Sequence, residues 1–120
     1  MIEALQKAGF AGVDAEQTPA GTVLHARLMP GSVPFTATAE GTLWRFALHW
    51  PLRASAAQLA EWAADHPDAP MDIHQGETRL SLVLHDGDVA AIQRWARLAP
   101  EAVAACVRWR RAQRAPGEGY

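Results

Sequence analysis

The sequence predicts an α+β fold in which an antiparallel sheet of about five strands, a meander plus a hairpin, is packed by three helices. Two patterns support this prediction. Residues 42–50 (TLWRFALHW) and 78–85 (TRLSLVLH) alternate apolar and polar side chains, which is the period of a strand with one buried face. Apolar residues between positions 92 and 107 instead recur at helical spacing. The predicted order of elements is α-β-β-β-α-β-β-α.

The first half of the chain contains the predicted meander. A short amphipathic helix at residues 2–8 is followed by a loop that includes AEQTPAG (15–21). Strands are predicted at 22–29, 32–40 and 42–50, and a Pro-Gly pair and a Glu-Gly pair separate them. We therefore expect these three strands to pair in sequence.

The second half contains the predicted hairpin and two further helices. Ser55 and Gln58 form the S-x-x-Q pattern of a capping box, in which each side chain bonds a backbone N–H group at the start of a helix. Residues 71–74 and 78–85 predict a hairpin around a Gln-Gly turn. The last helix keeps its apolar phase through Pro100, so we expect one kinked helix there rather than two helices.

Length and composition are those of a single globular domain. The chain has 120 residues, of which 49% are hydrophobic and 20% charged, and its net charge is −2. We predict one domain over residues 1–115 and a flexible tail at 116–120. The sequence shows neither a signal-peptide pattern nor an apolar run of membrane-spanning length, so we expect a cytoplasmic protein without membrane association.

Basic residues are concentrated near the end of the chain, in RWRRAQR (108–114), where Trp109 is available to stack on a base. Cations in the last turns of a helix also stabilise its negative end, by about 0.3–1 kcal/mol each. The rest of the chain is acidic and would repel nucleic acid. We therefore do not expect nucleic-acid binding, for which the only hint is the group Arg108, Arg110, Arg111 and Arg114.

No pattern in the sequence indicates a catalytic, cofactor or metal site. A nucleophile elbow, a phosphate-binding loop and zinc-ligand spacing are all missing from it. Cys106, the only cysteine, lies on the apolar stripe of the last helix, where a thiol is usually a small hydrophobic group. His25, His49 and His85 point outward from three different strands, but arginines on the same face would oppose a cation. We expect a non-enzymatic protein with no catalytic residue, no metal and no cofactor.

The outward face of the predicted sheet is the strongest candidate for a binding surface. Its arginines and histidines alternate with small apolar residues, and we expect no acidic residue on the same strands outside the turns. Arginine is enriched at protein interfaces, where its stem covers apolar surface while the guanidinium pairs with carboxylates or carbonyls. We predict that this face binds a polypeptide partner. The candidate contact residues are Arg27, Arg45, His49, Arg79, Val83 and His85.

Two other interpretations of this face are open. An antiparallel sheet commonly has water on one side, and then the face has no partner. Alternatively, Arg27, Arg45 and Arg79 bind an anionic small molecule, in a ligand-binding domain or a small enzyme. A concave site with converging polar groups would favour the ligand, whereas a broad face would favour a polypeptide.

The chain resembles the YbjN-like proteins and the type III secretion chaperones in its order of elements, most clearly over residues 55–113. There a helix (SAAQLAEWAADHP) leads to a hairpin (MDIHQGETRLSLVLHDG) and a long closing helix (DVAAIQRWARLAPEAVAACVRWRRA). The resemblance implies a small cytoplasmic, usually homodimeric protein that binds other polypeptides and has no catalytic site. Five tryptophans also predict a homodimer, because they supply more apolar surface than we expect one small core to hold.

Overall fold

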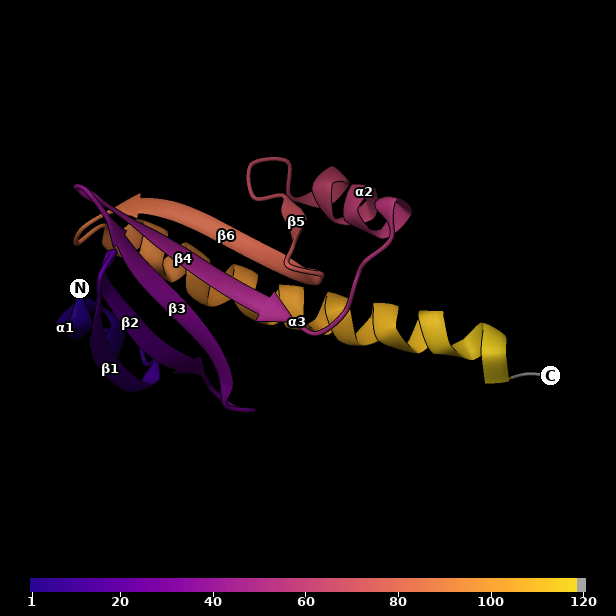
Figure 1. Cartoon of the computed structure of the whole chain (residues 1–120), viewed down its shortest axis with the longest axis horizontal. Coiled ribbons are helices and arrows are strands. Elements are labelled where there is room, and N and C mark those ends of the chain that lie inside the picture. The colour runs from indigo at the N-terminus through magenta and orange to yellow at the C-terminus, as the bar shows by residue number, and fades with distance from the viewer. Residues whose placement is uncertain (119–120) are drawn as a thin grey trace.

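The computed structural model describes residues 1–118 and confirms the predicted α+β class, with one strand more than expected (Figure 1). Six antiparallel strands form one sheet, and three helices accompany it. In chain order the elements are α1 (Ile2–Lys7), β1 (Ala11–Thr18), β2 (Gly21–Leu28), β3 (Val33–Glu40), β4 (Leu43–Trp50), α2 (Ala56–Asp65), β5 (Met71–His74), β6 (Glu77–His85) and α3 (Val89–Glu118).

The additional strand is β1, which forms one edge of the sheet. The strand order is β1-β2-β3-β4-β6-β5, so the predicted meander gains a strand before its first member. The loop expected at 15–21 is wrong in its first part, because β1 extends to Thr18 and pairs with β2. Most β1 side chains are exposed, so the strand is held by backbone pairing and by the Thr18 hydroxyl, which donates to the Gly21 carbonyl at 2.8 Å.

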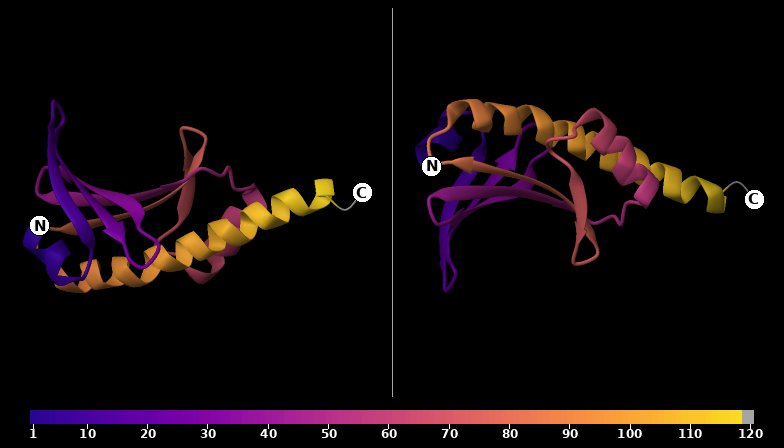
Figure 2. Two further views of the ribbon diagram at one scale, coloured as in Figure 1. Left: turned by 90° about the horizontal axis from the view of Figure 1, so that it is seen from below. Right: turned by 90° about the horizontal axis from the view of Figure 1, so that it is seen from above.

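The core lies between the sheet and the helices, all of which are on one side of it (Figure 2). Phe46 on β4 and Trp95 on α3 are both 0% exposed, and their rings meet edge to face at a centroid distance of 5.6 Å. Phe35 on β3 contacts both rings. The inward face predicted for β4 and β6 is therefore the one that packs against α3.

A capping box and a buried threonine fix the segment that joins β4 to α2. The Ser55 hydroxyl accepts from the Gln58 N–H at 3.1 Å, and the Gln58 side chain accepts from the Ser55 N–H at 2.9 Å, which confirms the predicted box. Thr78 on β6 donates its hydroxyl to the Leu52 carbonyl at 2.6 Å and accepts from the Ala54 N–H at 3.1 Å. This buried hydroxyl therefore satisfies two backbone groups outside the sheet ladder.

Helix α3 continues through Pro100 as one element and projects past the end of the sheet (Figure 1). Residues 116–118 of the expected tail are helical, and 119–120 lie outside the described residues. Near its end α3 is tied to the segment before α2, because the Gln113 amide donates to the Arg53 carbonyl at 3.1 Å.

The tryptophans are all at least partly covered within the chain. Trp62, Trp95 and Trp109 are buried, and Trp44 and Trp50 are half-buried. The premise that tryptophan content leaves a large apolar surface for a second subunit is therefore wrong. Trp62, Trp95 and Trp109 belong to the buried core, and Trp44 and Trp50 pack against it, which a count of residues could not reveal.

Candidate functional site

The face of the sheet turned away from the helices, called here the open face, is covered by no helix or strand of residues 1–118 (Figure 2). The sheet also bends, so that the β1–β2 hairpin and the β5 end turn away from α3 (Figure 2). Strand alternation and register place on this face Asp14, Glu16, Val23, His25, Arg27, Thr36, Thr38, Arg45, Ala47, His49, Arg79, Ser81, Val83 and His85.

Five of the six predicted contact residues lie on β4 and β6. Arg45 stands directly opposite Val83, and His49 stands opposite Arg79. His85 follows Val83 by two residues on the same face of β6, so of the six only Arg27 lies apart from this group. Arg27 is on β2, where it pairs with Pro34 of β3, and His85 is at the far end of β6, opposite Leu43.

The strands that carry the arginines have no acidic residue outside the turns, but neighbouring strands bring acidic residues onto the open face. Arg45 Nε donates to Glu40 at 2.9 Å, and Arg79 forms a two-pronged pair with Asp72, at 3.0 and 2.6 Å. Arg79 holds the pKa of the Asp72 carboxyl below its ordinary value, and Asp72 raises the pKa of Arg79. Each acid comes from an adjacent strand, so local alternation could not place it. Both guanidinium groups therefore already have a carboxylate partner.

The two basic residues on β2 are also engaged. Arg27 donates to the Ser32 carbonyl at 2.9 Å, and His25 Nε2 lies 2.8 Å from the Glu16 carboxylate of β1. With Arg45 and Arg79 paired as well, the three arginines of the alternative interpretation do not converge on a common point. An anionic ligand would have to displace carboxylates, and nothing in this arrangement favours it.

His49, on the open face, has a pKa below its ordinary value. Partial burial lowers its pKa most, and the positive charges of His74 and Arg79 lower it further, against the raising effect of Glu77 and Asp72. Its ring lies 5.6 Å from that of His74, centroid to centroid. Among the side chains that the structure describes, those of residues 1–114, no three His, Cys, Asp or Glu are placed to hold a metal ion.

A recessed pair of small residues lies at the centre of the open face. Ala47 and Ser81 stand opposite each other, and Ala47 is only 8% exposed although it points away from the helices. The Ser81 hydroxyl oxygen is buried without a hydrogen-bond partner among the described residues. Since no helix covers this face, longer side chains of the sheet must shield the pair. Sequence patterning did not identify it, because Ala47 and Ser81 become neighbours only once β4 pairs with β6.

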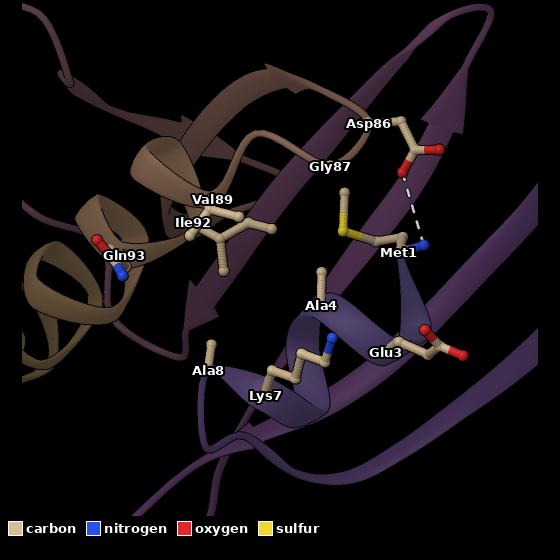
Figure 3. A pocket seen from close by; sticks show the side chains of 10 residues that line it. All are labelled: Met1, Glu3, Ala4, Lys7, Ala8, Asp86, Gly87, Val89, Ile92 and Gln93. Atoms are coloured by element: carbon tan, nitrogen blue, oxygen red, sulfur yellow. Dashed lines mark ion pairs between the residues drawn. The ribbon is translucent and has the colours of Figure 1, made fainter.

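A second candidate is an apolar cleft between α1 and the start of α3 (Figure 3). Its volume is about 530 Å³, within the usual range for ligand sites. Ala4 of α1 and Ala8, which follows the helix, lie across the cleft from Val89 and Ile92 of α3, and Lys7 also lines it (Figure 3). Glu3, Lys7, Asp86 and Gln93 add polar groups to the apolar walls, and the Met1 ammonium lies 3.5 Å from the Asp86 carboxylate (Figure 3).

The basic end of α3 does not form a stacking surface. Trp109 is 3% exposed, and its indole N–H donates to Glu61 of α2 at 3.1 Å, so the expectation that its ring is available to a base is wrong. Arg108 lies 3.8 Å from the same carboxylate group, and Arg110 donates to the Pro51 carbonyl. These contacts join α3 to α2 and to the segment before it.

Comparison with known proteins identifies no relative: no family model, no curated protein and no solved structure matches the chain significantly. None of the helices in residues 1–118 combines the length and apolar character needed to span a bilayer. Function must therefore be argued from the geometry of the chain itself.

Proposed function

We propose that this protein is a non-enzymatic binding domain that holds a polypeptide against the open face of its sheet. The observation that carries the proposal is the recessed Ala47–Ser81 pair, at the centre of a sheet face that every helix leaves bare. A buried hydroxyl without a partner costs about 1–3 kcal/mol. A bound chain that displaces the side chains shielding the pair would bring a peptide group within reach of the hydroxyl, so binding would recover part of this cost.

The surroundings of the pair also favour a polypeptide over a small anion. Val83, next to the pair on β6, is 43% exposed, whereas Arg45 and Arg79 are neutralised by carboxylates. Such a surface combines apolar area, balanced charge and hydrogen-bonding groups, as protein interfaces do. A second copy of the chain is among the polypeptides that the proposal includes. The proposed contact residues are Arg45, Ala47, His49, Arg79, Ser81 and Val83.

Site-specific photocrosslinking in cells that express the protein tests the proposal. A benzophenone amino acid replaces Val83 on the open face, or Arg97, which is exposed on α3, as the matched control. We expect discrete polypeptide adducts from position 83 and none from position 97. An adduct of twice the chain mass would identify a second copy as the partner.

A double variant, Arg45→Ser with Arg79→Ser, adds a second arm. Both side chains lie outside the core, so the circular dichroism spectrum should be unchanged while the adducts at position 83 decrease at least about fivefold. The proposal fails if position 83 gives no adduct. It also fails if positions 83 and 97 crosslink equally, or if the double variant crosslinks as well as the parent.

A further inference from the structure

The two edges of the sheet differ in length and cover. Strand β5 has four residues and packs against α2, whereas β1 has eight residues, of which 14–17 are all exposed. An edge strand presents a row of backbone N–H and C=O groups to any extended chain that can align with it. Strand β1 ends the strand order, so nothing in residues 1–118 pairs with its outer side.

The usable part of this edge is the stretch from Asp14 to Thr18. The register with β2 shifts between Ala11 and Asp14, where Gly12 has a φ of 61°, a conformation that favours glycine. From Asp14 onward the pairing is continuous, ending with Thr18 opposite Gly21. Alternate backbone groups of this regular stretch therefore point away from β2 and toward solvent.

The charge of the edge determines what can pair with it. Strand β1 contains Asp14 and Glu16, which alternate onto the open face, and it contains no lysine or arginine. Lysine and proline, which commonly protect edge strands from pairing, are both missing from β1. Glu16 pairs with His25, whereas Asp14 has no ion pair among the described residues. The stretch is thus an open edge with negative side chains on one face.

We propose that the β1 edge binds an extended polypeptide segment with basic side chains at alternate positions, which joins the sheet as an additional strand. Cross-strand neighbours lie about 4.5–5.5 Å apart, so lysines or arginines spaced two residues apart would each meet one carboxylate. The inference goes beyond the proposed function, because it concerns the edge rather than the open face and either can hold without the other.

A second copy of the chain does not fit this edge. Antiparallel pairing of two β1 strands centred on Ala15 would set Asp14 of each copy opposite Glu16 of the other. Like charges directly opposite each other destabilise a strand pair. The same two carboxylates that attract a basic segment therefore discourage sheet extension by self-association.

Titration of the full-length chain with two peptides of equal composition tests this inference. One peptide is an acetylated and amidated (Lys-Thr)₄ repeat, and the other contains four lysines followed by four threonines. Amide chemical shifts should move at residues 14–18 with the alternating peptide, and the block peptide should bind at least about fivefold more weakly. Two further versions of the repeat are N-methylated at alternate backbone nitrogens, one at the lysines and the other at the threonines. The version whose methylated nitrogens would otherwise donate to β1 should not bind.

Charge-neutralising variants complete the test. Asp14→Asn with Glu16→Gln should raise the Kd for the alternating peptide about tenfold. The matched control, Glu3→Gln with Asp65→Asn, changes the net charge equally at exposed positions elsewhere and should leave the Kd within about twofold. The inference is overturned if the shifts map away from β1, if both peptides bind alike, or if both double variants behave alike. None of these results changes what is expected of the crosslinking from position 83, so each proposal can fail without the other.

Discussion

The two faces of the same sheet contrast in what they bury and in what they leave free. On β4, Phe46 is fully buried against α3, while its neighbour Arg45 lies on the open face in an ion pair with Glu40. Adjacent residues of one strand therefore contribute to different properties of the protein. Core packing on the helix side stabilises the fold, and substitutions on the open face can change recognition at little cost in stability.

The sharpest test of this contrast is a pair of truncations. Phe46→Ala should lower the free energy of unfolding by about 3–5 kcal/mol, because it leaves a cavity beside Phe35 and Trp95. Val83→Ala, on the exposed face of β6, should lower it by less than about 0.5 kcal/mol. Urea denaturation of both variants measures the difference. A loss below about 1 kcal/mol for Phe46→Ala would contradict the assigned faces.

Two threonines extend the comparison to hydrogen bonding. Thr78→Val removes the hydroxyl that bonds both Leu52 and Ala54, and this should cost about 1–3 kcal/mol, because the buried Ala54 N–H loses its partner. The Leu52 carbonyl keeps the Thr78 backbone N–H at 2.8 Å. Thr36→Val makes the same substitution at a half-buried residue of the open face and should cost less than about 0.5 kcal/mol. Equal midpoints in thermal denaturation would show that the Thr78 bonds do not stabilise the fold.

The recessed serine should behave in the opposite way. Ser81→Ala removes a buried hydroxyl that bonds no described group, so the free energy of unfolding should rise by a few tenths to about 1 kcal/mol. Crosslinking from position 83 should fall at the same time, because the bound chain loses a hydrogen bond. A destabilised variant in urea denaturation would mean that the hydroxyl already has a partner in solution.

The smallest expected effect concerns pH. The pKa of His49 is below the ordinary value of 6.5, so the folded state favours the neutral imidazole. Its contribution to stability should be complete above about pH 6.5 and should fall as the pH drops below that value, where the unfolded chain is protonated first. Proton NMR titration of the ring should give a midpoint below 6.5 that rises in Arg79→Gln, since a nearby positive charge is removed.

In His49→Gln, the loss of stability between pH 7.5 and 5.5 should be smaller than in the parent chain. An imidazole midpoint at or above 6.5 would contradict the assigned environment of His49.

The fold could be predicted where side-chain burial alternates along a strand. TLWRFALHW assigned its two faces correctly because the large apolar residues Trp44, Phe46, Leu48 and Trp50 alternate with the polar or small residues Arg45, Ala47 and His49. Strand β1 could not be predicted in this way, since AGVDAEQT has Val13 as its only large apolar residue. Its strand conformation comes from backbone pairing with β2, which leaves no periodic signal in the side chains.

The candidate site was predictable only in part, for a related reason. Outward positions such as Arg45 and Arg79 follow from one strand alone, whereas their counterions depend on the register between strands. The Asp72–Arg79 pair could have been found, because a hairpin around Gln75–Gly76 aligns these two positions. The Ala47–Ser81 pair could not, because the two strands are separated by α2 and β5 in the sequence.

The burial of Cys106 gives the chain an intrinsic reporter of unfolding. It is the only cysteine, its side chain is 1% exposed, and burial raises its thiol pKa to about 11. An alkylating reagent at neutral pH should therefore modify it only in molecules whose core has transiently opened. When reclosing is faster than alkylation, the labelling rate reports the equilibrium population of the open form. Native-state fluctuations of the α3 packing are thus measurable in the unaltered protein, without an engineered label.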